Sequence, residues 1–145
     1  MATTAQWFAK AGGALIADLW VPRQMGIILM KASYVPDIDT QMLYADVAAQ
    51  ELAAGGGYAT GGLEITGRST VYNAGADRWD LMGDDVLWGP GATFTTHYGI
   101  VYEMATAEKR LWEILNFGQD YAIANGYFTV DFSSAVLAVA AGPPV

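Results

Sequence analysis

The stretch that decides the fold is Thr93 to Thr106, TFTTHYGIVYEMAT, the longest uninterrupted run with the character of a β-strand. Its aromatic and β-branched residues alternate, which suits a pleated strand and not a helix. One face reads Phe94, Thr96, Tyr98, Ile100 and Tyr102; the other reads Thr93, Thr95, His97, Gly99, Val101 and Glu103. Both faces carry apolar bulk, so we predict an interior strand of a sheet that is covered on both sides.

Shorter strands are predicted on either side of this stretch. Met25–Lys31 is a continuous apolar run between breaking residues, which is typical of a buried strand. Further strand candidates are residues 63–66, 69–73, 78–81, 86–88, 111–117, 126–132 and 135–140. The composition of residues 73–77 predicts a hairpin turn, and residues 118–126 are expected to return the chain between two strands.

Two helical segments are expected in the first third of the chain. Residues 5–18 can form one or two helical turns, capped by Thr3 or Thr4 and stopped by Val21-Pro22. Residues 41–52 are predicted to form a short helix capped by Asp39 or Thr40, and a glycine-rich loop follows at residues 53–62.

This order of elements predicts the fold class. Several short strands with close turns and no alternating long helices indicate a mainly β protein, an antiparallel β-sandwich or barrel-like domain with short helices near the amino terminus. No internal repeat or linker is visible. We therefore predict one domain over residues 1–145, with terminal arms at residues 1–7 and 141–145.

Composition excludes several classes of partner. The formal net charge is −8 and the few cations are scattered, so phosphate backbones and anionic lipid surfaces should repel the chain. The chain has no cysteine, which excludes disulfides and thiolate sites, and no apolar run approaches the roughly 20 residues that span a bilayer. Only 15% of residues are charged, against ~25% in typical globular proteins, so we expect protein partners or other copies to cover much of the surface.

Two acidic pairs and one glycine cluster were weighed as ligand sites. Asp37 with Asp39, and Asp84 with Asp85, have oxygens that could help to hold Ca²⁺ or Mg²⁺, but aspartates also start turns, and the further ligands of an EF-hand loop are missing. The glycines of residues 55–62 lack the Gly-Lys-Ser/Thr ending of a phosphate-binding loop. Turn and loop roles are therefore favoured for all of them.

His97 is the only histidine, so a multi-histidine metal site is impossible. A catalytic triad would need one of the serines Ser33, Ser69, Ser133 or Ser134, yet the chain has no G-x-S-x-G motif. A hydrogen-bonded structural histidine is the favoured interpretation. We assign no catalytic residue, no metal ligand and no cofactor.

The tryptophans allow two interpretations. Trp7, Trp20, Trp79, Trp88 and Trp112 could form a stacking platform for sugars or bases, or they could lie in the core and at protein interfaces. The second interpretation is simpler.

The order of several short motifs resembles a known family. These motifs are Ser33 to Thr40 (SYVPDIDT), Tyr44 with Asp46-Val47, Gly57-Tyr58, Gly61-Gly62, Asp84 to Trp88 (DDVLW), Thr93 to Tyr102 and Phe117-Gly118. In this order they resemble small proteins encoded among the virion genes of tailed bacteriophages. The chain differs from them at Thr96-His97-Tyr98, where an Ala-Arg-Tyr-like triplet is usual, and in the glycine content of its loop.

The resemblance implies a non-enzymatic virion structural protein. We expect a capsid decoration or head-fibre-base protein that is made in the host cytoplasm, self-associates and binds the major capsid protein or other virion proteins on the capsid exterior. Terminal residues would contribute to the interface: Trp7, Phe8, Pro143 and Pro144. The alternatives are a tail tube, tail-tip or adaptor component, or a carbohydrate-binding β-sandwich module.

Overall fold

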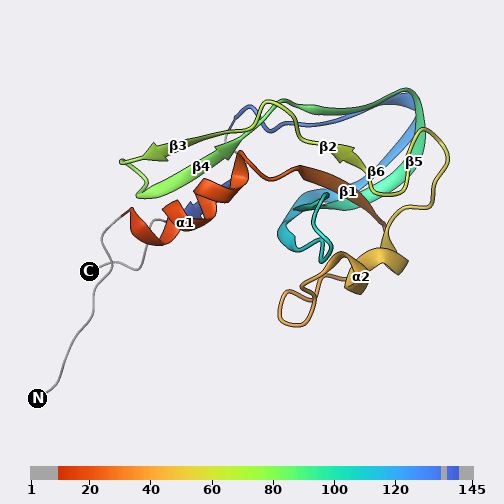
Figure 1. Cartoon of the computed structure of the whole chain (residues 1–145). Helices are drawn as coiled ribbons and strands as arrows, with labels where there is room; N and C mark the ends of the chain where they lie inside the picture. Colours follow the sequence, from red (N-terminus) through yellow and green to blue (C-terminus); the bar gives the residue numbers. More distant parts are fainter. Residues whose placement is uncertain (1–9, 135–136, 141–145) are drawn as a thin grey trace, which may run out of the picture. The chain divides into compact units, whose positions relative to one another are not determined.

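The computed structural model describes residues 10–134 and 137–140, and it shows two compact units (Figure 1). The core unit comprises Gln24–Thr66 and Asp85–Val130. The terminal unit comprises the described parts of Met1–Arg23, Gly67–Asp84 and Asp131–Val145. Compactness does not show whether either unit folds by itself, so the single domain over residues 1–145 stays a prediction.

The core unit is one antiparallel sheet. Its strands are β1 (Met25–Lys31), β2 (Leu63–Glu64), β5 (Val86–Glu103) and β6 (Leu111–Val130), in the spatial order β2-β1-β5-β6. The interior strand predicted from residue 93 onward is confirmed, because β5 pairs with β1 on one side and β6 on the other. The mainly β, antiparallel class is also confirmed, and the described strands do not close this sheet into a barrel.

Two predicted breaks in the long hairpin are wrong. Residues 86–88 and 93–103, predicted in separate strands, belong to the single strand β5, and the predicted residues 104–106 lie beyond its end at Glu103. Residues 118–126 do not return the chain but continue β6 without interruption. Register shifts between Trp88 and Ala92 and between Thr96 and Tyr98 allow the pairing to continue past the glycines, as β-bulges do.

Both faces of β1 are buried, as its continuous apolar run predicted. On one face, Ile28 and Met30 pack in a cluster with Ile100, Tyr102 and Val47. Ile27 and Leu29 alternate with them and lie on the other face, and both are fully buried. The sheet is therefore covered on both faces at β1, and side-chain packing on both faces fixes the position of this strand.

Aromatic rings join β5 and β6 beyond the end of β1. The ring of Phe128 lies at the centre of this cluster, with centroids 6.0 Å from Trp88, 6.0 Å from Phe94, 5.3 Å from Phe117 and 5.8 Å from Tyr121. Edge-to-face pairs at such distances stabilise beyond the apolar area that they bury. These contacts hold the two long strands together over the far part of the hairpin.

The terminal unit packs one helix on a second antiparallel sheet. Its elements are α1 (Ala11–Trp20), β3 (Ser69–Asn73), β4 (Arg78–Met82) and β7 (Leu137–Ala140), with the strand order β3-β4-β7. Trp20 is fully buried and its Nε1 donates to the Met82 carbonyl at 2.9 Å. The predicted hairpin turn at residues 73–77 is confirmed, with Asn73 Oδ1 accepting from the Ala76 amide at 3.0 Å.

Both helices differ from their predicted bounds. The described part of the first helix runs from Ala11 to Trp20, past the expected end at residue 18 and through Gly12-Gly13, because packing of Trp20 outweighs glycine propensity. The second is only α2 (Tyr44–Val47) followed by the 3-10 helix η1 (Ala48–Gln50). It ends early because Leu52 donates its amide to the Leu29 carbonyl at 2.9 Å and so pairs with the sheet.

The helix start also differs from the prediction. Neither Asp39 nor Thr40 caps α2; instead Asp46 Oδ2 accepts the amides of Met42 at 2.9 Å and Leu43 at 2.8 Å. The carboxylate thus reaches back over the first turn to unpaired amides that precede it.

We expect Gly62→Ala to destabilise the fold by about 2–4 kcal/mol, because it combines left-handed strain with overpacking. Gly62 has φ +68°, and a Cβ there would lie 1.9 Å from the Ile27 carbonyl oxygen. Gly118→Ala is the control, since Gly118 has φ +85° and a Cβ would meet nothing within 4 Å. Urea unfolding of both variants measures the difference, and equal losses would contradict the packing assigned to Gly62.

Candidate functional site

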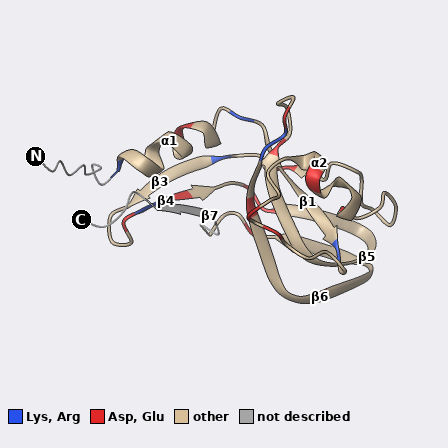
Figure 2. Ribbon diagram, turned by 90° about the horizontal axis from the view of Figure 1, so that it is seen from below, with Lys and Arg blue, Asp and Glu red and all other residues tan. Residues whose placement is uncertain are grey.

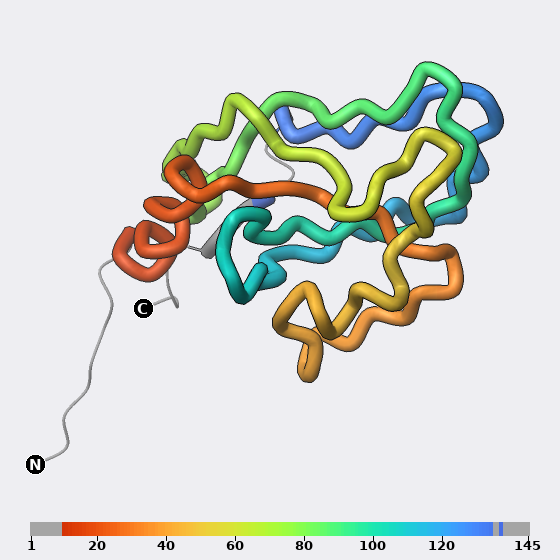
Figure 3. The backbone as a smooth tube through the Cα atoms, turned by 45° about the vertical axis from the view of Figure 1, so that its right-hand side comes forward, coloured from red at the N-terminus to blue at the C-terminus, as the bar shows by residue number. Residues whose placement is uncertain are grey.

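The two most exposed large apolar side chains in the described part of the core unit lie in one loop between β1 and α2. This apolar loop, Tyr34 to Met42, presents Val35, Ile38 and Met42, which are 78%, 80% and 59% exposed. Tyr34 anchors its start, because the ring is 3% exposed and packs in the β1–β5 cluster. Figure 3 shows the orange-to-yellow excursion between β1 and β2 to which the loop belongs.

Internal hydrogen bonds fix the backbone of the apolar loop. Asp37 Oδ1 accepts the amides of Asp39 at 3.2 Å and Thr40 at 3.3 Å, while Asp37 Oδ2 accepts the Thr40 hydroxyl at 2.6 Å. Gln41 Oε1 accepts the Tyr34 hydroxyl at 2.6 Å. The bond from the Thr40 hydroxyl, with those from the two amides, lowers the pKa of Asp37. These bonds therefore hold the loop backbone that carries the exposed apolar side chains.

The acidic pair of this loop serves the turn. Asp37 uses both carboxylate oxygens on the turn, and no hydrogen bond or ion pair joins it to the Asp39 side chain. Within residues 10–134 and 137–140, no three His, Cys, Asp or Glu side chains gather as a metal site would require. In the second pair, the Asp84 carboxylate packs so close to Gly67 that a Cβ on that glycine would meet it at 2.6 Å.

A small cleft lies between the apolar loop and β6. Its volume is about 220 Å³, and its lining includes Tyr34, Ile38, Met42, Trp112 and Glu113. Pockets for drug-sized ligands usually measure about 300–1,000 Å³. This cleft is large enough for a single side chain of a partner and too small for a typical cofactor.

Glu113 is an unpaired carboxylate in the lining of this cleft. It is half-buried, and no described residue forms a hydrogen bond or ion pair with it. Burial raises the pKa of Glu113 to about 7, because the charged form loses hydration without gaining a partner. The carboxylate therefore changes charge near neutral pH.

A second buried carboxylate, Glu51, is fully paired. It accepts the hydroxyl of Tyr44, the hydroxyl of Tyr58 at 2.6 Å and the amide of Gly61 at 2.7 Å. Burial, reinforced by the bond to Glu51, raises the pKa of both tyrosines, so both hydroxyls stay protonated as donors. Tyr58 also accepts the Leu29 amide at 3.2 Å, which ties the network to β1.

This network accounts for the glycine-rich loop at residues 53–62. Gly61 donates to Glu51 and accepts the Tyr102 hydroxyl at 2.6 Å, while the Gly56 carbonyl accepts the Thr93 amide at 2.8 Å. A phosphate-binding loop needs amides that point outward to a ligand. Here the Gly61 amide points at the protein's own carboxylate, so the loop is tied down against the sheet.

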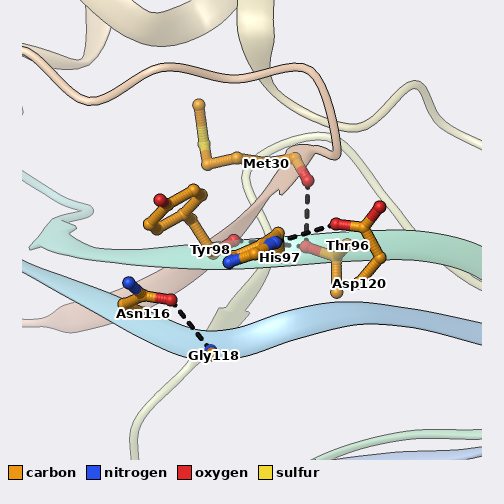
Figure 4. Close-up of polar contacts among 7 residues, drawn as sticks. All are labelled: Met30, Thr96, His97, Tyr98, Asn116, Gly118 and Asp120. Atoms are coloured by element: carbon orange, nitrogen blue, oxygen red, sulfur yellow. Dashed lines mark hydrogen bonds and ion pairs between the residues drawn. The ribbon is translucent and has the colours of Figure 1, made fainter.

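His97 on β5 contacts Asp120 on β6, across the β5–β6 hairpin (Figure 4). Its Nδ1 lies 2.8 Å from Asp120 Oδ1, and its ring stacks on Tyr98 with centroids 4.6 Å apart. The contact lies at a bulge, because Thr96 pairs with Tyr121 while Tyr98 pairs with Asn116. No described serine hydroxyl is hydrogen-bonded to His97, so the triad arrangement weighed from the sequence does not form there.

The described tryptophans do not form one platform. Trp20 and Trp88 are buried, and half-buried Trp112 donates its Nε1 to Glu103 Oε1 at 3.0 Å. Trp79 belongs to the terminal unit and donates to the Lys10 carbonyl at 3.2 Å. A sugar-binding surface built from several tryptophans therefore has no support in the described residues.

The interface residues predicted from the sequence are Trp7, Phe8, Pro143 and Pro144, and all lie outside the described residues. The exposed apolar side chains of the loop at residues 34–42 were not among these predicted interface residues. Val35 and Ile38 lie in a segment whose aspartates indicate a loop, whereas Met42 lies in the segment predicted as a helix, residues 41–52. A second exposed apolar set lies on α1 of the terminal unit, where Leu15, Ile16 and Leu19 are exposed.

Surface charge agrees with the composition. Figure 2 shows no stripe of Lys and Arg along either unit over the residues that are described. None of the described helices combines the length and the apolar character needed to cross a membrane. The exposed surfaces that remain as candidates are apolar.

Comparison with known proteins identified no related protein. A scan against protein-family models and searches of curated proteins and of solved structures found no match to this chain.

We expect Tyr58→Phe to destabilise the protein by about 1–3 kcal/mol, because it leaves the buried Glu51 carboxylate and the Leu29 amide each without one partner. Tyr72→Phe removes an exposed bond to Asp77 and should change stability by less than about 0.5 kcal/mol. Thermal unfolding at pH 7 measures both. Equal, small losses of stability in the two variants would show that Glu51 does not need the Tyr58 hydroxyl as a hydrogen-bond donor.

We expect the stability contributed by Glu113 to be complete below its ordinary pKa of 4.5 and to be lost as pH rises to about 7, since burial favours the protonated form. The loss should be about 1–3 kcal/mol, because solvent reaches part of the side chain. Glu113→Gln should remove this slope and exceed wild type in stability at pH 8.

Urea unfolding at a series of pH values measures the Glu113 effect. Glu108→Gln, which removes an exposed carboxylate paired with Arg110, is the matched control and should keep the wild-type slope. A Glu113→Gln profile parallel to wild type would contradict the burial of this carboxylate.

Proposed function

We propose that this chain is a non-enzymatic structural protein of a bacteriophage virion. In this proposal it decorates the capsid exterior or forms the base of a head fibre, self-associates, and binds the major capsid protein. The resemblance of its ordered motifs to phage virion proteins supports the setting, and the exposed apolar surfaces support the mode of action.

The observation that carries the proposal is the apolar loop. Val35, Ile38 and Met42 are more exposed than buried, yet hydrogen bonds from Asp37 and Gln41 hold the loop rigid. Exposed apolar groups on a fixed backbone are typical of docking surfaces, since little conformational freedom is lost on binding. A loop selected only for solvation would not present these side chains.

The polar groups support a non-enzymatic role. Glu51 and Asp37 are each engaged by several donors of the chain itself, and His97 is paired with Asp120. Catalysis by acid, base or nucleophile needs such groups grouped around a site for a substrate. In the described residues they lie in separate networks that hold loops and strands together.

The mechanism is stabilisation of the shell by mass action. A protein that binds only the assembled shell stabilises it by RT ln(1 + L/Kd) per site, where L is its free concentration, and linkage between copies raises the effective affinity of each. Weak docking through one small loop is therefore sufficient when it is repeated over a lattice.

A tail position is the alternative within the virion. A tube, tip or adaptor component would use the same exposed loop against other partners, and its location on the particle separates the two roles.

We expect Ile38→Asp to abolish binding of the purified protein to empty shells of its capsid protein, because a charge would be buried in an apolar contact. Val71→Asp, at an exposed apolar site on β3, is the control and should bind as wild type. Co-sedimentation with shells measures both. Full binding by the Ile38 variant would remove the apolar loop from the interface, and no binding by wild type would count against the capsid role.

A further inference from the structure

Strand β6 forms one edge of the core sheet. Among the described strands its partner is β5, whereas the opposite edge is only the two-residue strand β2 (Figure 1). From Tyr121 to Val130 it pairs with the first half of β5 through registers such as Phe94 with Ile123 and Trp88 with Phe128. The other side of this half of β6 carries no neighbouring strand in the described part of the chain.

This half of the hairpin is a two-stranded ribbon. Strand β1 pairs with β5 only between Thr96 and Glu103, so β5 before Thr96 has β6 as its one strand partner among those described. The free side of β5 is met by the glycine-rich loop, where the Thr93 amide donates to the Gly56 carbonyl at 2.8 Å. Two-stranded ribbons are marginally stable in water, and a third strand stabilises them.

The outer edge of β6 has unused hydrogen-bonding groups. In an antiparallel pair, every second residue directs its amide and carbonyl away from the partner strand. The Asn125 amide faces β5, where it donates to Thr93 Oγ1 at 3.1 Å, and no described group outside β5 bonds to the backbone of residues 121–130. The outward groups can therefore receive another strand.

Charge and proline, two common protections of an edge strand, are missing here, while the register shift between Ile123 and Gly126 leaves a bulge in the segment. Residues 121–130, YAIANGYFTV, contain no charged residue and no proline. Natural edges are commonly blocked by lysine, proline or inward-pointing charges. Exposed side chains on this segment are small or apolar, including Ala122, Ala124 and Tyr127, the last of which is 61% exposed.

We propose that this edge pairs antiparallel with the same segment of β6 in a second copy of the chain, extending the sheet across a two-fold axis. A strand edge presents both donors and acceptors, so an identical strand related by two-fold symmetry is complementary to it.

Charge favours a copy at this segment in particular. Each chain carries a net charge of −8, which disfavours contact between copies over most of the surface, whereas residues 121–130 are neutral.

The inference rests on the proposed function in one respect: it locates the self-association that the proposed function includes. It is tested with purified protein and no virion. If the purified protein is a monomer that still binds capsid shells, the inferred edge pairing is wrong and the capsid role stands. If it is a dimer that binds no shell, the edge pairing stands and the capsid role is wrong.

The test compares two charged forms of the edge. One variant carries Ala124→Lys with Tyr127→Lys, and the other carries Ala124→Glu with Tyr127→Glu; both positions are exposed, so circular dichroism should match wild type. We expect wild type to sediment as a dimer, each variant alone to dimerise at least about tenfold more weakly, and an equimolar mixture to regain dimerisation through opposite charges.

The matched control places two lysines on the apolar loop, Val35→Lys with Ile38→Lys, and should leave dimerisation unchanged. Hydrogen exchange of wild type should show amides of residues 121–130 protected at high concentration and exposed on dilution. A wild-type monomer at millimolar concentration, a dimer insensitive to both β6 variants, or a dimer lost only with the loop lysines would each overturn the inference.

Discussion

The constraint on which the rest of the structure depends is the two-sided burial of β1 against β5. Ile28 and Met30 fill one face of the sheet while Ile27 and Leu29 fill the other, so a slip of β1 by one residue would exchange the two sets and disrupt the packing on both faces. The loops that leave these strands are therefore fixed at their bases. The apolar loop begins at buried Tyr34, three residues after β1 ends, and inherits this rigidity.

The Glu51 carboxylate connects the glycine-rich loop at residues 53–62 to this sheet. It takes donors from Tyr44, Tyr58 and Gly61, and Tyr58 in turn accepts the Leu29 amide of β1. A buried carboxylate is costly unless it is fully paired, so this network specifies one arrangement of the loop. The carboxylates of Glu51 and Asp37 position chain segments, whereas Glu113 lies without a described partner in the cleft beside the apolar loop.

The sequence predicts the local elements well and the long-range ones poorly. Met25–Lys31 and Ser69–Asn73 have the bounds that their residues indicate, because an apolar run and a turn-bounded alternating segment depend on neighbours in sequence. Gly118 indicates a strand end, yet β6 continues, because pairing with β5 absorbs the irregularity in a bulge. The hydrogen-bonding role of Glu51 could not be predicted, because the residue lay within a predicted helix. Its partners Tyr44 and Tyr58 are each seven residues away and approach it only in the folded chain. The exposure of Val35 and Ile38 could not be predicted either, since it follows from Tyr34 taking the buried position beside them. The predicted terminal interface stays a prediction.

In the function that we propose, the sheet presents fixed apolar surfaces to other proteins. The central claim is a position on the outside of a phage capsid, with the apolar loop against the shell. Electron cryo-microscopy of intact particles, with this chain located in the density, tests that claim most directly. The account predicts repeated copies on the capsid exterior with Val35, Ile38 and Met42 at the contact; density for the chain confined to the tail, or particles that lack it altogether, would contradict it.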